Sequence, residues 1–204
     1  VPTLLWAKLD NIYILLMLIS TLWMGAIGCL DDYIKVFKKD KKGLRGIFKV
    51  IGQIVLGIIV GSTLYLHPEV TSKEKLPVVE AASWEAGEEA PAATYGDAVK
   101  SSKTTLPFLK DNEFDYEIFT RWLGPTGSTW TWLVYIFAVI FIITAVSNGA
   151  NLTDGLDGLA TGTTAIAGTA LLVLAYVSGS IVFSSYLNIM YIPNSGELVI
   201  FTAA

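Results

Sequence analysis

Apolar residues run along this chain in four long stretches, which are separated by polar stretches of very different length. The apolar stretches cover residues 11–30, 50–66, 129–147 and 160–183, and another begins near 198. Each of the four approaches the roughly 20 mostly apolar residues that a membrane-crossing helix needs. The pattern therefore predicts an all-α fold, a polytopic transmembrane helix bundle with four full spans and the start of a fifth.

Composition supports this fold class. The chain is 53% hydrophobic and only 16% charged, and its mean hydropathy is +0.56. Soluble domains carry about 25% charged residues. A soluble core accommodates one long apolar stretch, but four in 204 residues are typical of an integral membrane protein.

The positions of Lys and Arg predict how the spans are oriented. The short stretch 31–49 holds seven of the 14 basic residues, whereas 148–159 holds none. Short loops rich in Lys and Arg stay in the cytoplasm. Counting the spans from there puts 67–128 outside, as an extracytoplasmic insertion, and 148–159 back inside. The polar stretches 31–49 and 148–159 are therefore expected on the same, cytoplasmic face.

The insertion 67–128 is polar and acidic. Eleven of the 18 Asp and Glu residues lie in 67–121, with little periodicity, so we expect a solvated and partly disordered segment. Residues 106–124 have apolar positions at near-helical spacing, which is typical of a segment that lies along the membrane surface. His67, the only histidine, lies on this side and is not a catalytic candidate.

Two adjacent carboxylates, Asp31 and Asp32, directly follow the first apolar stretch. On a helix they point about 100° apart, so only one of them faces a given pocket. They either cap the following helix or act beside a phosphate or Mg²⁺. Lys35 shares a helix face with Asp32, and Lys49 precedes the second span at the depth of the lipid headgroups. Both lysines are candidate phosphate-binding residues.

A second polar cluster follows the third apolar stretch, in the sequence "SNGANLTDGLDG". Its polar residues recur every three positions, at Asn148, Asn151, Asp154 and Asp157. Residues at this spacing share one broad face of a helix or a 3₁₀ turn. Amides suit the edge of a base, and carboxylates suit base N–H groups, sugar hydroxyls or a metal. The stretch is either a substrate site or a polar turn between two spans.

Taken together, "GCLDDYIKVFKKDKKGL" and "SNGANLTDGLDGLATG" resemble the polyprenyl-phosphate N-acetylhexosamine-1-phosphate transferases. The resemblance covers nearly everything outside 67–128, which is longer than we would expect for the family. It implies a bundle of roughly ten membrane helices with a cytoplasmic catalytic cleft, of which this chain is a fragment.

The resemblance also implies a reaction. The wording "NLTDGLDGLA" is closest to the branch that transfers phospho-MurNAc-pentapeptide from UDP-MurNAc-pentapeptide to undecaprenyl phosphate, giving lipid I and UMP in peptidoglycan synthesis. The implied cofactor is Mg²⁺, and the implied location is the bacterial cytoplasmic (inner) membrane, in contact with membrane lipid. A homodimer is left open, and no nucleic-acid partner is expected.

The residues matched to the family receive expected roles. Asp31 is expected to take the proton of the lipid phosphate, or to act as a nucleophile in a two-step scheme, with Asp32 as its catalytic partner. Lys35 and Lys49 are expected near the phosphates. The second cluster is expected on the nucleotide and metal side of the cleft, with substrate binding by Asn148, Asn151 and Asp154 and metal binding by Asp157 and Asp154.

Both ends of the sequence read as cut, and the further catalytic Asp and His-rich loop expected of the family are missing. We therefore expect an internal fragment that is inactive alone. Three alternatives are a UDP-GlcNAc:undecaprenyl-phosphate GlcNAc-1-phosphate transferase, an ion-coupled membrane transporter and a structural membrane scaffold. Transporter carboxylates lie near the membrane midplane, whereas these lie at span ends on one face. A scaffold leaves the regular Asn/Asp spacing unexplained.

Overall fold

The computed structural model describes residues 2–39, 43–73, 97–106, 113–121, 128–153 and 158–204. Its helices are α1 (Pro2–Trp6), α2 (Ile12–Phe37), α3 (Gly46–Leu66), α4 (Thr131–Thr153), α5 (Leu159–Ser178), α6 (Ile181–Tyr186) and α7 (Leu198–Ala203). The remaining elements are the strands β1 (Lys103–Thr105) and β2 (Glu113–Asp115) and the 3₁₀ helices η2 (Tyr116–Phe119), η4 (Ser128–Trp130) and η5 (Ser195–Glu197).

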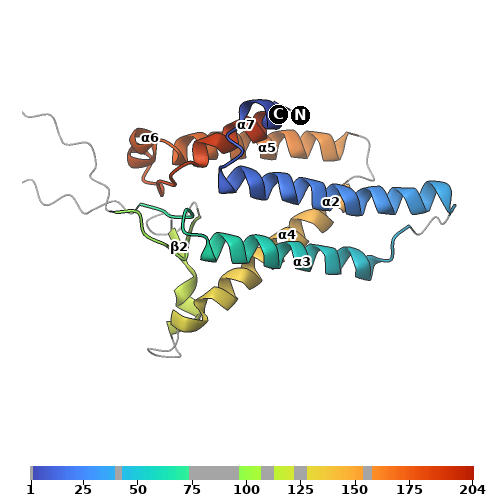
Figure 1. Cartoon of the computed structure of the whole chain (residues 1–204), viewed down its shortest axis with the longest axis horizontal. Helices are drawn as coiled ribbons and strands as arrows, with labels where there is room; N and C mark the ends of the chain where they lie inside the picture. Colours follow the sequence, from blue (N-terminus) through green and yellow to red (C-terminus); the bar gives the residue numbers. More distant parts are fainter. Residues whose placement is uncertain (1, 40–42, 74–96, 107–112, 122–127, 154–157) are drawn as a thin grey trace, which may run out of the picture.

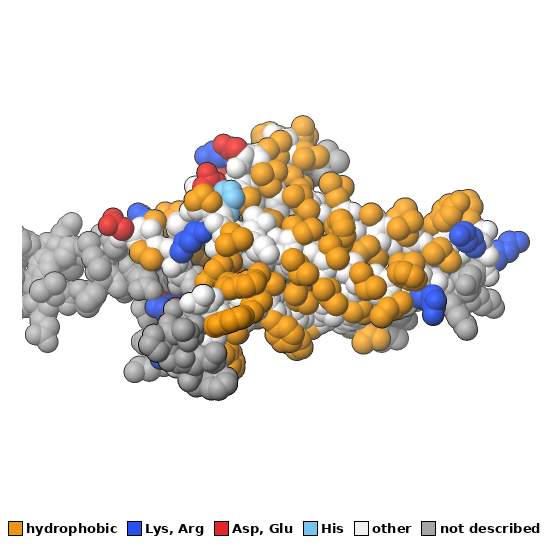
Figure 2. Space-filling view, turned by 60° about the horizontal axis from the view of Figure 1, so that its bottom comes forward, with side chains coloured by type: hydrophobic (Ala, Val, Ile, Leu, Met, Phe, Trp, Pro, Cys, Tyr) orange, Lys and Arg blue, Asp and Glu red, His pale blue; other side chains and the backbone are white. Residues whose placement is uncertain are grey.

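Four of these helices, α2, α3, α4 and α5, are long and apolar enough to cross a membrane. Figure 2 shows a broad band of hydrophobic side chains between two ends that carry the charged ones. This distribution confirms the predicted class, an integral membrane protein built from a polytopic helix bundle.

The long helices bring the two polar motifs to one end of the molecule (Figure 1). Helices α2 and α3 run antiparallel side by side, α4 crosses α3, and α5 lies on the other side of α2. The C-terminal ends of α2 and α4 and the N-terminal ends of α3 and α5 point to the same end. The paired strands β1 and β2 lie at the opposite end.

Two helices continue past their apolar stretches into the motifs. Helix α2 starts at Ile12, where the side chain of Asn11 accepts a hydrogen bond from the Tyr13 N–H at 2.8 Å, and it runs on to Phe37 instead of ending near 30. Helix α4 likewise runs to Thr153 instead of ending near 147. A membrane boundary changes which side chains are favourable but leaves the backbone hydrogen bonds of the helix intact, so hydrophobicity alone does not mark its end.

Helix α5 ends at Ser178, short of the predicted 183, because the chain is crossed there by η5. A Cβ on Gly179 would lie 2.6 Å from the backbone nitrogen of Gly196, so only glycine permits this approach. The hydroxyls of Ser178 and Ser195 are 3.1 Å apart and join the two segments. Helix α6 then starts afresh at Ile181.

Within the insertion, the segment 106–124 is described only at 106 and 113–121, and these residues form no α-helix. They hold β2 and the 3₁₀ helix η2. Strand β2 pairs antiparallel with β1, with Phe114 opposite Thr104. The segment before β1 is attached to the bundle by Lys100, whose Nζ donates to the carbonyls of Tyr65 (3.2 Å) and Leu66 (2.5 Å) at the end of α3.

Helices α3 and α4 approach each other closely at two glycines one turn apart. A Cβ on Gly57 would lie 2.8 Å from the Cα of Ile140, and one on Gly61 would lie 3.2 Å from the Cα of Ile136. Small residues at this spacing let membrane helices approach closely. The start of α5 is also rich in Gly, Ala and Thr, yet a Cβ on Gly162 or Gly168 would have nothing within 4 Å.

The close contact at Gly57 predicts that a larger residue there disturbs the packing of α3 against α4. Gly57→Ala pushes the new methyl group against the backbone of α4, and overpacking of this kind costs about 1–3 kcal/mol. We expect a lower melting temperature in detergent, measured by intrinsic fluorescence. The matched control is Gly28→Ala on α2, which has open space at the Cβ position and is expected to melt no lower than the wild type. Equal melting of the two variants would show that the glycine contact is not tight.

Candidate functional site

The side chain of Asp31 is the centre of the first motif. It projects from the C-terminal part of α2 and is only 8% exposed. Its Oδ2 lies 2.6 Å from Nζ of Lys35 and 2.9 Å from Nζ of Lys49, and its Oδ1 accepts a hydrogen bond from the Leu44 N–H at 2.7 Å. Both carboxylate oxygens are thus engaged by partners from α2, from α3 and from the link between them.

The helix geometry separates Asp31 from Asp32, as predicted. Asp31 faces α3, whereas the side chain of Asp32 is 77% exposed and contacts only Lys35, at 3.7 Å, among the ion pairs of the described residues. Neither carboxylate caps α3: both lie inside α2, and the residue before α3, Arg45, makes no side-chain cap. The capping interpretation is therefore wrong. Asp32 keeps oxygen atoms available for a ligand.

The two lysines reach Asp31 by different routes. Lys35 lies one helical turn after it, at the i,i+4 spacing that suits an ion pair. Lys49 lies in the first turn of α3 rather than ahead of that helix. Since the two ammonium groups share one carboxylate oxygen and remain partly exposed, they give this end of the molecule a concentrated positive charge.

The second motif contacts α3 one turn further along, through Gln53, whose side chain is buried. The Gln53 amide donates to Oγ of Ser147 at 2.9 Å and accepts from Nδ2 of Asn148 at 3.0 Å. Nδ2 of Asn148 also donates to the Thr144 carbonyl at 2.8 Å. One donor bond of the Asn148 amide therefore joins α4 to α3 and the other lies within α4. The substrate-binding role of Asn148 stays a prediction.

The other residues of the second motif are only partly described. Asn151 is exposed in the last turn of α4, where its side chain is available to a ligand. Asp154 and Asp157, the predicted metal ligands, lie outside the described residues. Among the described residues, no three His, Cys, Asp or Glu side chains gather into a metal cluster.

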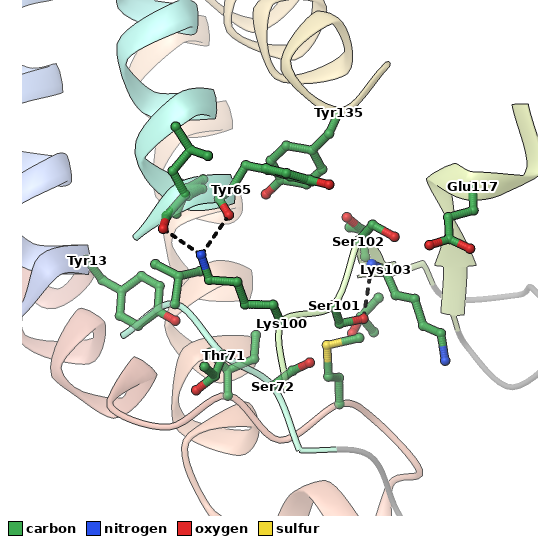
Figure 3. Close-up of a pocket in the computed structure, with 17 residues that line it drawn as sticks. Tyr13, Tyr65, Thr71, Ser72, Lys100, Ser101, Ser102, Lys103, Glu117 and Tyr135 are labelled. Atoms are coloured by element: carbon green, nitrogen blue, oxygen red, sulfur yellow. Dashed lines mark hydrogen bonds between the residues drawn. The ribbon is translucent and has the colours of Figure 1, made fainter. Parts of the chain in front are cut away.

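A large pocket lies at the opposite end of the bundle (Figure 3). It has a volume of about 520 Å³ and is lined by residues that include Tyr13, Tyr65, Lys100 and Tyr135. None of the predicted site residues lines it. The pocket therefore belongs to the junction of the insertion with the helices, and the candidate site is the charged cluster around Asp31.

The chain is similar to known proteins over its whole length. Residues 90–201, just over half of the sequence, match the model of glycosyl transferase family 4. The chain belongs to this family. It is also 58% identical over its full length to a phospho-N-acetylmuramoyl-pentapeptide-transferase of Flavobacterium psychrophilum, covering 49% of that protein. Proteins of the same name from Amoebophilus asiaticus and Parabacteroides distasonis are 57% and 52% identical, with 49% and 48% covered.

The chain spans about half the length of these curated relatives. The glycosyl transferase family 4 match contains the second motif but starts after the first. The alignments with the relatives cover the whole chain and therefore span both motifs. Membership of glycosyl transferase family 4 thus agrees with the family resemblance, and the structure adds the contacts of Asp31.

Sequence reasoning missed two contributors to this end of the molecule. The Leu44 N–H carries no side-chain signal, so its bond to Asp31 is visible only in three dimensions. Gln53 did carry a signal, because an amide inside an apolar stretch needs a polar partner on a neighbouring helix. The side chains of Ser147 and Asn148 on α4 are those partners.

The burial of Asp31 predicts unequal effects of neutralising the two carboxylates. Asp31→Asn leaves both lysines without their shared anion. Breaking a buried pair costs about 3–5 kcal/mol, and partial exposure of the lysines reduces this to on the order of 2 kcal/mol. The variant should melt several degrees lower in detergent. The control, Asp32→Asn, changes an exposed carboxylate and should melt like the wild type; a comparable loss in both would contradict a special role of Asp31.

Proposed function

We propose that the longer protein containing this chain transfers phospho-MurNAc-pentapeptide from UDP-MurNAc-pentapeptide to undecaprenyl phosphate, giving lipid I and UMP. The observation that carries the proposal is the Asp31–Lys35–Lys49 cluster at one end of a membrane helix bundle. The printed name of the 52–58% identical relatives supports it.

The chemistry requires positive charge. An oxygen of the lipid phosphate bonds to the sugar-bearing phosphorus of the UDP donor, and the bond from that phosphorus to UMP breaks, so that UMP leaves with the electron pair. Both reactants are anions, and catalysis of such a transfer rests mainly on neutralising and positioning them. The ammonium groups of Lys35 and Lys49 supply this charge at fixed positions.

The geometry supports different roles for the two carboxylates. Asp31 has both oxygens engaged, and this supports a role in positioning the lysines rather than in taking a proton. Asp32 is exposed and is the carboxylate available to accept the proton of the lipid phosphate or to approach a cation. Asn151 is the exposed amide available to the nucleotide.

We propose Mg²⁺ as the cofactor. Mg²⁺ binds through one or two carboxylates together with substrate phosphates, so the exposed Asp32 fits this use. Asp154 and Asp157 are the further proposed ligands. When bound, the ion would neutralise the diphosphate of the donor.

We also propose that the protein lies in the bacterial cytoplasmic membrane with both motifs on the cytoplasmic face. The described Lys35, Lys38, Lys39, Arg45 and Lys49 all lie in the polar stretch between α2 and α3 or next to it. Positive residues of this kind favour the cytoplasmic side.

The test is a UMP-release assay of the longer protein in detergent, with undecaprenyl phosphate, UDP-MurNAc-pentapeptide and Mg²⁺. We expect release that requires Mg²⁺. Lys49→Met should lower kcat/KM by about 100-fold or more, as loss of one electrostatic stabiliser does. The control is Lys8→Met, an exposed lysine at the other end of α2, which should retain activity.

The UDP-sugar that is accepted as donor distinguishes the two transferase branches. Release with UDP-GlcNAc alone would replace the proposed donor by that of a GlcNAc-1-phosphate transferase. Absence of release with either donor would overturn the proposed function and favour the transporter alternative, which ion-flux measurements in vesicles would then address.

A further inference from the structure

In the link between α2 and α3, Gly43 and Leu44 fold back onto the Asp31–Lys35 pair. The turn is made at Gly43, which is buried and has a φ of +62°, in the left-handed region that favours glycine. The turn directs the next N–H group, that of Leu44, to Oδ1 of Asp31 at 2.7 Å. A backbone donor from the link thus holds the carboxylate oxygen that the lysines leave free.

The contact leaves no room for a side chain. A Cβ on Gly43 would lie 2.5 Å from Oδ1 of Asp31 and 2.7 Å from Cε of Lys35. Gly46, three residues later at the first position of α3, has nothing within 4 Å of its Cβ position and no positive φ. The demand for glycine is therefore specific to Gly43 and comes from both its conformation and its neighbours.

We propose that the Gly43–Leu44 turn is a positioning element of the catalytic site. It fixes the rotation of the Asp31 carboxylate, so that Oδ1 meets the Leu44 N–H and Oδ2 is presented to Lys35 and Lys49 together. The turn thereby sets where the two ammonium groups lie. This inference rests on the proposed function, since it assigns the turn a purpose in neutralising the phosphates.

A substitution at Gly43 rotates or displaces the carboxylate, and the lysines move with it. Displacement of a positioned group by about 1 Å can cost 100-fold in rate. Substrate binding draws on many other contacts along the nucleotide and the lipid. We therefore expect Gly43→Ala to lower kcat by about 30- to 100-fold while the KM values of both substrates stay within about threefold.

The experiment compares Gly43→Ala with Gly46→Ala in the longer protein, by UMP release under the conditions given above. Gly46→Ala should keep wild-type kcat. Gly43→Asn separates strain from contact, because Asn tolerates a positive φ but still carries a Cβ. If the contact with Asp31 matters, Asn will be as impaired as Ala; recovery of wild-type kcat by Asn would overturn the inference.

A second measurement does not depend on activity or on the folding of a Gly43 variant. Hydrogen exchange of the peptide that contains the Leu44 amide should be slow in the wild type and faster in Asp31→Asn. Absence of protection in the wild type would overturn the inference. If the wild type is inactive but its Leu44 amide is protected, the proposed function is rejected and the contact of the turn with Asp31 remains. If the wild type and Gly43→Ala are both fully active, only the role of the turn is rejected.

Discussion

The buried carboxylate of Asp31 is the interaction on which this end of the molecule depends. Removing a carboxylate from water is costly, and the cost is offset only when its oxygens are well occupied. Here two ammonium groups and one backbone N–H occupy them. The three partners come from α2, from the link and from α3, so one side chain joins the two antiparallel helices and their connection.

The same cluster carries an excess of positive charge. One anion is shared by two cations. The ammonium groups around this desolvated carboxylate attract further negative charge, which a phosphate would provide. Asp32 pairs with Lys35 at 3.7 Å and offsets this charge, whereas Lys38, Lys39 and Arg45 in the same polar stretch add to it.

Much of this architecture follows from the sequence, because the length and composition of apolar stretches predict membrane helices directly. The separation of Asp31 from Asp32 also follows, from the 100° step of an α-helix. The apolar stretches did not mark the helix ends: α2 and α4 continue into polar residues that pair with lysines or hydrogen-bond to a neighbouring helix. The early end of α5 depends on Gly196, a contact between residues distant in sequence.

The candidate site was predicted as a set of residues but not as an arrangement. Spacing identified Asp31, Lys35 and Lys49, and the structure brings these three together. The sequence could not show that Asn148 bonds to Gln53, because that contact joins positions 95 residues apart. Nor could it show that a turn at Gly43 reaches Asp31, since a glycine in a polar link is compatible with many turns.

The buried amide of Gln53 has a consequence for the order in which the protein is made. Its partners, Ser147 and Asn148, are synthesised more than 90 residues later, after the whole segment that separates α3 from α4. Until then α3 would hold an unpaired amide at membrane depth, which is unfavourable in hydrocarbon. Because α4 supplies the partners of that amide, α3 gains its full set of polar contacts only after α4 has been synthesised.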